Sequence, residues 1–173
     1  MHIKKFMGGF MATVSTILLL AGCNSDDAST TPGQTGSAQV LVAHASPDAP
    51  AVDLLVDNTI VGTNLAFPNS TGYLTVGAGT RNIKVRVAGT TTTVIDANLP
   101  ITANTNYTVF AADSVSKLTT IVLTDDLSSP AAGKAHVRFV HLSPNAPAVD
   151  VALQGGAVVF ANTAFKGSTA FTL

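Results

Sequence analysis

The chain has 173 residues, of which 46% are hydrophobic and only 11% are charged, and its formal net charge is -1 at pH 7. This composition excludes a disordered, highly solvated chain, and it gives no electrostatic reason to expect a nucleic-acid partner. The sequence contains neither Trp nor Glu, and Thr, Asn and Ser fill many of its polar positions. Because Glu and Lys usually cover exposed helix faces while Val and Thr favour strands, the composition predicts an all-β fold.

Residues 1–22 have the layout of a secretory signal peptide. Positive charges near the N-terminus precede an apolar run of about 15 residues, which ends in the string Leu-Ala-Gly-Cys at residues 20–23. This run is shorter than the roughly 20 residues that a bilayer-spanning helix needs. The string resembles a bacterial lipobox, and the resemblance implies cleavage before Cys23 and acylation of that residue. The alternative is an uncleaved membrane anchor with an incidental cysteine.

The lipobox resemblance also predicts a location. In Gram-negative lipoproteins an Asp just after the lipidated cysteine favours the inner membrane, and this chain has Asn24 there, which favours the outer membrane. Residues 23–37 are rich in Ser, Thr, Asp, Gly and Gln, and this composition predicts a flexible tether. We therefore expect a cell-envelope protein whose first partner is the membrane, through its lipid anchor.

Residues 38–127 carry the pattern of a β-sandwich. Apolar residues alternate with more polar ones in residues 38–44 and again in 52–56. Further strands are predicted at residues 59–64, 72–76, 82–88, 92–97, 106–112 and 118–124. Gly and Thr at residues 77–80 predict a hairpin-like break. Such closely spaced short strands predict an antiparallel β-sandwich.

One local feature favours an immunoglobulin-like version of this sandwich. Residues 99–109 resemble a tyrosine corner, in which the hydroxyl of a Tyr near a strand start, here Tyr107, bonds to upstream backbone. The alternative is a strand tyrosine whose hydroxyl lies in solvent.

A ten-residue string occurs twice. His-Ala-Ser-Pro-Asp-Ala-Pro-Ala-Val-Asp covers residues 44–53, and His-Leu-Ser-Pro-Asn-Ala-Pro-Ala-Val-Asp covers residues 141–150. Its prolines fix φ and remove backbone donors, so each string predicts a stiff crossing outside any strand ladder. The motif residues that we expect to have structural roles are His44, Ser46, Pro47, Asp48, Pro50, Asp53, His141, Ser143, Pro144, Pro147 and Asp150.

The repeat divides the chain. Residues 128–134 form a predicted linker, and residues 135–173 form a partial second copy. Asn-Thr-Ala-Phe at 162–165 corresponds to Asn-Leu-Ala-Phe at 64–67, with one additional residue between the motif and this string. Counterparts of residues 76–124 do not follow, which predicts one complete module and an incomplete second one. A truncated product would explain this, as would an adhesin whose open module accepts a partner's strand.

The motif, placed after a Val-rich strand, resembles a bacterial family of unknown function known as DUF4397. The resemblance covers residues 38–126 and the start of the second copy. It implies a secreted or surface-attached protein with tandem domains and an immunoglobulin-like fold. It supplies no catalytic or ligand-binding residues, and the missing end of the second copy departs from its pattern.

The motif also contains residue types that catalysis and metal binding use. His44, Ser46 and Asp53 are those of a hydrolase triad, but no glycine-rich nucleophile elbow accompanies them. His44 lies at the end of an apolar face, so a structural role is expected, and pairing with Asp53 is its other plausible role. The carboxylates of Asp48, Asp53 and Asp57 suit calcium chemically, although Asn145 and Gln154 replace two of them in the second copy. We therefore expect no metal site and no cofactor.

These observations predict a lipid-anchored envelope protein that is not an enzyme and whose modules have a binding or structural role. The Thr run at residues 90–93 and the weakly charged surface suit contacts with a surface protein or a glycan, and they suit a solvated strand end equally well. The runner-up is an envelope hydrolase that uses the His44, Ser46 and Asp53 cluster, and the strand-accepting adhesin is the third possibility.

Overall fold

The computed structural model describes residues 35–172. Within this range the chain forms ten strands and one 3-10 turn. They are β1 (Ser37–Ala45), β2 (Val52–Val56), β3 (Thr59–Leu65), β4 (Leu74–Gly77), β5 (Gly79–Val87), β6 (Thr93–Ile101), β7 (Asn106–Ala112), η1 (Val115–Lys117), β8 (Thr119–Asp125), β9 (Val149–Ala152) and β10 (Val158–Thr163). The predicted signal peptide, Cys23 and most of the tether lie outside the described residues. No helix of the described part is long and apolar enough to cross a membrane.

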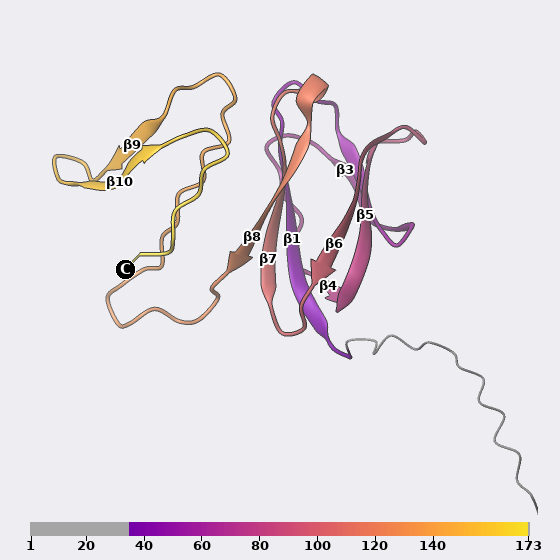
Figure 1. Cartoon of the computed structure of the whole chain (residues 1–173), viewed down its shortest axis with the longest axis horizontal. Helices are drawn as coiled ribbons and strands as arrows, with labels where there is room; N and C mark the ends of the chain where they lie inside the picture. Colours follow the sequence, from indigo (N-terminus) through magenta and orange to yellow (C-terminus); the bar gives the residue numbers. More distant parts are fainter. Residues whose placement is uncertain (1–34, 173) are drawn as a thin grey trace, which may run out of the picture. The chain divides into compact units, whose positions relative to one another are not determined.

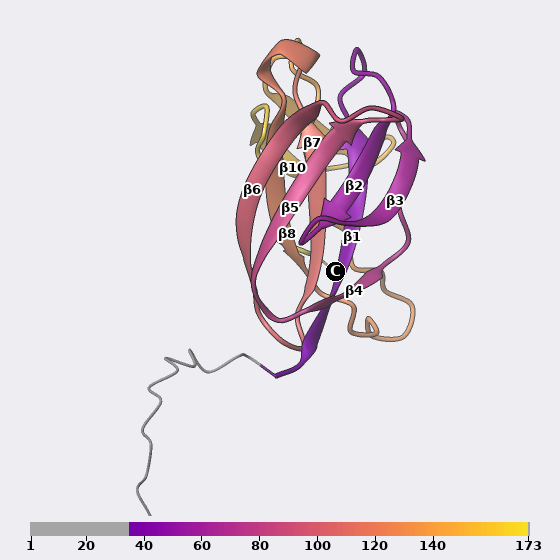
Figure 2. The same cartoon turned by 90° about the vertical axis from the view of Figure 1, so that its right-hand side faces the viewer.

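Eight of these strands form the sandwich. One sheet has the order β4-β1-β7-β8 and the other has the order β3-β2-β5-β6, and Figure 2 shows the two layers one behind the other. Alternating residues of both sheets point into the space between the layers, because successive strand residues face opposite sides. The resulting core contains Ala38, Val40, Val42, Val52, Leu54, Val76, Ile83, Val85, Ile95, Ile101, Tyr107, Val109 and Ala111.

The predicted all-β sandwich is confirmed, and its strand pairs are antiparallel with one exception. β1 runs parallel to β7, from Gln39 opposite Asn106 to Ala45 opposite Ala112. The hairpin expected at residues 77–80 is wrong. β4 pairs with β1 in one sheet and β5 pairs with β2 and β6 in the other, so the chain changes sheets here with one residue between the strands.

The tyrosine expected at a corner lies near the start of β7. The Tyr107 hydroxyl accepts a hydrogen bond of 3.3 Å from the backbone N–H of Thr102, as in a tyrosine corner. The Thr102 side chain is the first cause of the lowered pKa of Tyr107, and the backbone hydrogen bond lowers it further, because hydrogen bonds to the oxygen stabilise the charged phenolate. The immunoglobulin-like version of the sandwich stays a prediction, since a corner alone does not define the topology.

The sandwich consists of two halves that meet in both layers. Strands β1–β4 form one half and strands β5–β8 form the other. The halves join where β1 pairs with β7 and where β2 pairs with β5. Both junctions lie at the middle of their sheets (Figure 2). The first half alone would therefore expose two unpaired strand edges.

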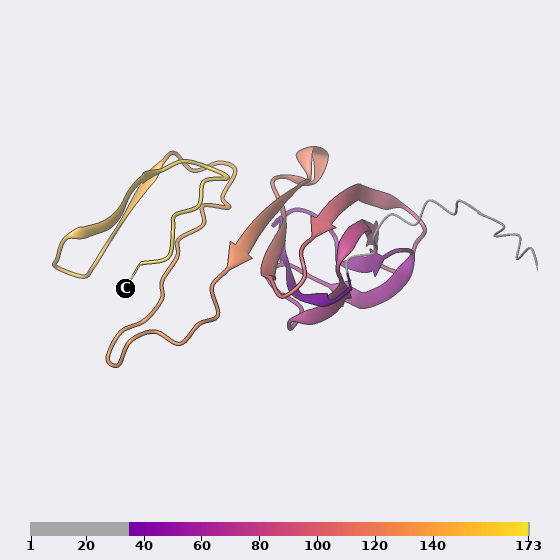
Figure 3. The same ribbon diagram turned by 60° about the horizontal axis from the view of Figure 1, so that its bottom comes forward.

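The second repeat reproduces the first half at the level of single hydrogen bonds. The N–H of Val42 donates to Thr71 Oγ1 at 3.0 Å, and the N–H of Phe139 donates to Thr169 Oγ1 at 3.0 Å. β9 and β10 form a two-stranded sheet, and two isolated bridges join the segments 137–140 and 168–172 (Figures 1 and 3). The same sequence thus builds the same local structure twice.

Candidate functional site

The first copy of the motif carries the chain from one sheet to the other. β1 ends at Ala45 in the first sheet and β2 begins at Val52 in the second, so residues 46–51 span the gap between them. Pro47 and Pro50 lie in this crossing, where neither of their missing backbone donors interrupts a sheet ladder. The two prolines therefore stiffen the connection between the two sheets.

His44 holds the crossing at both ends. Its side chain is 2% exposed, its Nδ1 accepts the N–H of Ser46 at 3.4 Å, and its Nε2 lies 3.0 Å from the carbonyl oxygen of Pro50. Because a carbonyl only accepts, Nε2 carries the proton and Nδ1 is the acceptor. The ring of Phe67 packs edge-on against the imidazole, with 6.5 Å between ring centroids.

His141 repeats this arrangement in the second copy. Its Nδ1 accepts the N–H of Ser143 at 3.3 Å, and its Nε2 lies 3.0 Å from the carbonyl oxygen of Pro147. Phe165 packs edge-on against it, as Phe67 does against His44. Both ring nitrogens of each histidine are therefore engaged with backbone, and neither is directed at a nucleophile.

The hydrolase cluster does not assemble. Ser46 is fully buried, and its hydroxyl donates to Asp48 Oδ1 at 3.2 Å instead of to a histidine. The same carboxylate accepts the N–H of Val115 at 2.9 Å, so Asp48 ties the crossing to the start of η1. A serine nucleophile needs access to substrate as well as a base, and the Ser46 side chain is fully buried and has no histidine as its hydroxyl's partner.

Asp53 stabilises two turns and does not pair with His44, so the alternative role considered for that histidine is wrong. Its Oδ1 accepts the N–H of Asn64 at 2.8 Å and its Oδ2 accepts the N–H of Gly89 at 3.1 Å. These bonds, that of Asn64 first, lower the pKa of Asp53. Asn64 has a φ of 51°, a conformation that Asn tolerates better than most residues. Asp150 caps Asn162, whose φ is 47°, in the same way.

The three carboxylates considered for calcium have separate partners. Asp57 accepts the N–H of Asn82 at 3.0 Å, which is the first cause of its lowered pKa, and it also forms an ion pair with Arg81. Asp48 and Asp53 are engaged as described above. Within residues 35–172 no group of three potential metal ligands converges.

A cleft of about 500 Å³ lies between the two motifs. Its lining comes from the end of β1, the first crossing, the loop after β3, β7 and the start of the second crossing. The lining residues are Ala43, His44, Ala45, Pro47, Phe67, Pro68, Phe110, Leu142, Ser143 and Pro144. Apolar side chains dominate, and Phe67 is 45% exposed there. The composition and volume are those of a site for an apolar group.

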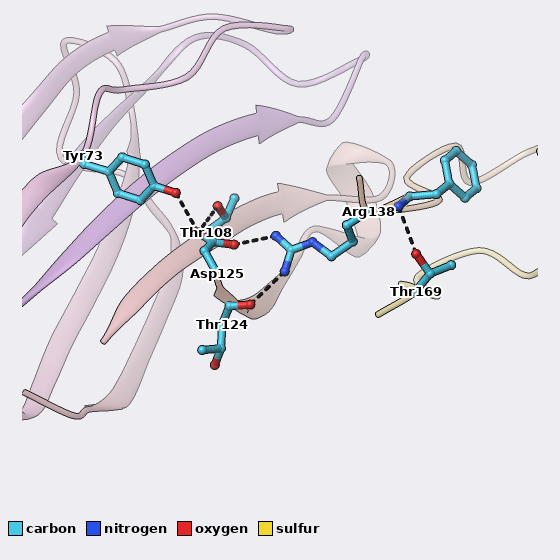
Figure 4. Close-up of polar contacts among 7 residues, drawn as sticks. Tyr73, Thr108, Thr124, Asp125, Arg138 and Thr169 are labelled. Carbon is cyan, nitrogen blue, oxygen red and sulfur yellow. Dashed lines mark hydrogen bonds and ion pairs between the residues drawn. The ribbon is translucent and has the colours of Figure 1, made fainter. Parts of the chain in front are cut away.

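A buried polar network joins the second repeat to the sandwich (Figure 4). Asp125 is 8% exposed and pairs with Arg138, while Thr108 Oγ1 and the Tyr73 hydroxyl donate to Asp125 Oδ2 at 2.6 Å and 2.9 Å. Burial, and then the neighbouring Asp125, raise the pKa of Tyr73. Arg138 also donates to the carbonyl of Thr124 at 2.8 Å.

Sequence reasoning missed this network and the cleft. The network had one signal, because Arg138 occupies the position that Leu41 has in the first copy, and a charged residue in a Val-rich strand needs a partner. The cleft had none, since Phe67 and Phe110 are distant in sequence from each other and from Leu142. A second ion pair, Lys166 with Asp113 at 2.8 Å, also links the repeats.

Comparison with known proteins agrees with the repeated motif. The model of the family described as "Domain of unknown function (DUF4397)" matches residues 38–152, which is more than half of the chain. The match starts at the beginning of β1 and continues through the second motif to the end of β9. The search of curated proteins gives no match.

Proposed function

The chain belongs to the DUF4397 family, and from this premise we propose that it is a lipid-anchored, non-enzymatic binding protein of the cell envelope. The observation that carries the proposal is the apolar cleft bordered by both motifs. The binding site is this cleft, and the ligand is a molecule or peptide that places an aromatic or aliphatic group in it.

The chemistry of the cleft supports binding over catalysis. Of its lining residues, only His44 and Ser143 have polar side chains, and both nitrogens of His44 already have backbone partners. Burying apolar surface there would supply affinity of roughly 25 cal/mol per Å². The motif residues shape the walls of the site and present no reactive group to it.

A fluorescent apolar probe tests the site. We expect 1-N-phenylnaphthylamine to bind the full chain in a saturable manner, and Phe110→Ala to weaken binding about tenfold, equivalent to about 1.4 kcal/mol. Val122→Ala is the matched control, because Val122 is a solvent-exposed apolar residue on neighbouring β8 that does not line the cleft. Equal probe binding by all three proteins would refute the cleft as the binding site.

Anchoring at Cys23 is a separate part of the proposal. Its support is the Leu-Ala-Gly-Cys string followed by Asn24 and a polar segment. We expect the native protein to enter the detergent phase on extraction and to carry acyl chains on Cys23 by mass spectrometry. Cys23→Ser should abolish the acylation. An unmodified Cys23 in the native host would contradict the anchor and leave the cleft unaffected.

The hydrolase alternative has a direct test in Ser46→Ala. We expect this variant to melt at a lower temperature, since it loses the hydrogen bond from the buried Ser46 hydroxyl to Asp48. Turnover of chromogenic ester substrates by this variant should be the same as by the wild type. Lost turnover at an unchanged melting temperature would favour the hydrolase.

The strand acceptor is a second candidate function, and a specific observation favours it. Val137, Val158 and Val159 of the second repeat are 49%, 51% and 41% exposed. Isolated exposed hydrophobic residues are ordinary, but a group of them around unpaired strand edges marks an interaction site.

A further inference from the structure

Two ion pairs attach the second repeat to the sandwich at opposite ends of β7. Asp125, the partner of Arg138, lies opposite Asn106 at the start of β7 (Figure 4). Asp113, the partner of Lys166, directly follows the end of β7. Since a strand rises about 3.3 Å per residue, β7 separates the two attachments by roughly 20 Å. The second repeat is therefore fixed at two well-separated points.

The apolar cleft lies between these attachments. Phe110, one of its lining residues, belongs to β7 and alternates with the core residues Val109 and Ala111, so it is on the face of the sheet that points away from the core. The facing wall is formed by residues 142–144 of the second repeat. Because each repeat supplies one wall, the width of the cleft depends on where the second repeat lies.

The covalent connection between the repeats does little to fix that position. Residues 126–135 are all exposed. Among the described residues, β9 and β10 form a sheet of their own and pair with no strand of the sandwich. Exposed connections with few contacts are the places where packed units move relative to each other. The closed position of the second repeat is thus maintained mainly by the side chains at the two attachments.

We propose that the second repeat is a hinged cover of the apolar cleft, held closed by the two ion pairs and locked by a bound ligand. The inference rests on the proposed function and adds the regulation of its site. A ligand that touches both walls binds the closed arrangement and shifts the population towards it. The apparent dissociation constant equals the intrinsic one divided by the closed fraction, so a change that opens the cover weakens binding without touching the cleft.

The two attachments contribute unequally to closure. The side chains of Arg138 and Asp125 are 12% and 3% exposed, and opening would leave a charge of this pair without its partner, which is costly in a buried site. The Lys166 side chain is 43% exposed, so its ion pair is weaker and is screened by salt. Closure therefore depends chiefly on Arg138, and Lys166 supports it at the other end of β7.

A variant outside the cleft tests the coupling. We expect Arg138→Leu to raise the dissociation constant of the full chain for 1-N-phenylnaphthylamine at least about fivefold, although Arg138 does not line the cleft. Arg81→Leu is the matched control, because it removes an ion pair with Asp57 inside the sandwich and also lies outside the cleft. Its dissociation constant should stay within about twofold of the wild-type value.

The outcomes separate this inference from the proposed function. Probe binding that Phe110→Ala weakens and Arg138→Leu leaves unchanged would overturn the hinged cover and retain the cleft as the binding site. Equal losses in Arg138→Leu and Arg81→Leu would also overturn the cover. A wild-type chain that does not bind the probe would refute both.

Covalent closure distinguishes opening from misfolding. In a Cys23→Ser background that also carries Arg138→Leu, the changes Asp113→Cys and Lys166→Cys place the only two cysteines of the chain at the second attachment. We expect weak probe binding before reaction with a short bis-maleimide. The internally cross-linked monomer should bind the probe within about twofold of the wild-type affinity, because the link restores the closed arrangement. Binding that stays weak after cross-linking would overturn the proposal.

Discussion

The two repeats begin with the same motif and the same hydrogen bonds, but only the first has a closed core. In the first, strands β5–β8 cover the residues that β1–β4 expose. In the second, β9 and β10 have the local structure of β2 and β3, and within residues 35–172 no further strands cover them. The comparison separates what the motif does, which is to fix a crossing locally, from what closes a sandwich, which is the pairing of two halves.

The largest expected effect comes from removing the histidine of each motif. His44→Ala leaves the N–H of the buried Ser46 without its acceptor and removes a buried ring that packs against Phe67. Because an unsatisfied buried group costs about 1–3 kcal/mol and the lost ring leaves a cavity, we expect the free energy of unfolding to fall by about 4 kcal/mol. Urea denaturation followed by circular dichroism measures it. His141→Ala should leave the main transition of the sandwich largely unchanged, and an equal loss in both variants would show that the repeats unfold as one unit.

The next effect concerns the position at which the repeats differ in charge. Arg138→Leu gives the second repeat the residue that the first has at Leu41, and it leaves the buried Asp125 without its cation. We expect the free energy of unfolding to fall by about 3 kcal/mol, the lower end of the cost of breaking a buried ion pair. The cost is at the lower end because Tyr73 and Thr108 still donate hydrogen bonds to the Asp125 carboxylate. Hydrogen exchange should show faster opening of residues 135–172.

A double-mutant cycle with Asp125→Asn sharpens this expectation. If the two side chains stabilise each other, the double variant should be less destabilised than the sum of the single ones. Additive effects would indicate that Arg138 acts through its other contacts, which are the Thr124 carbonyl and the ring of Phe171 at 4.6 Å.

A matched pair of valines measures core closure itself. Val40→Ala should cost about 2 kcal/mol, from lost apolar burial and a cavity that the closed core cannot fill. Val137→Ala should cost less than about 0.5 kcal/mol, since the side chain is half exposed. Thermal unfolding of both variants compares them. Similar losses would mean that the second core is as closed as the first.

The sequence predicted the strands well because their alternation is local. The expected strands at 59–64, 106–112 and 118–124 differ by at most one residue at each end from β3, β7 and β8. Pairing between strands is not local, and there the expectations failed. Residues 77–80 have the composition of a hairpin turn, yet β4 and β5 belong to different sheets. The parallel pairing of β1 with β7 likewise depends on contacts across more than 60 residues.

The motif was predictable in outline but not in its bonds. Two prolines indicate a stiff crossing, and a histidine at the end of an apolar face indicates a buried ring. The partner of that ring could not be predicted, because the carbonyl of Pro50 and the carboxylate of Asp53 both follow His44 within the same motif. The backbone of the crossing decides between them, and it brings the carbonyl to Nε2.

The smallest expected effect is a pH dependence of the second repeat alone. Lys166 takes the place of Pro68 in the first copy, and its ammonium, followed by the N–H of Ser114, lowers the pKa of Asp113. A carboxylate whose pKa is lower in the folded state than its unfolded value of about 3.9 stabilises the fold above that value. This contribution is lost as the pH falls through the folded pKa. We therefore expect limited proteolysis within residues 135–172 to accelerate on acidification below about pH 4.

The Lys166→Met variant tests the role of the ammonium. It should be cleaved faster than the wild type at neutral pH and at the same rate at low pH. If the two proteins still differ at low pH, Lys166 stabilises the repeat through its alkyl chain and its contact with the ring of Phe165.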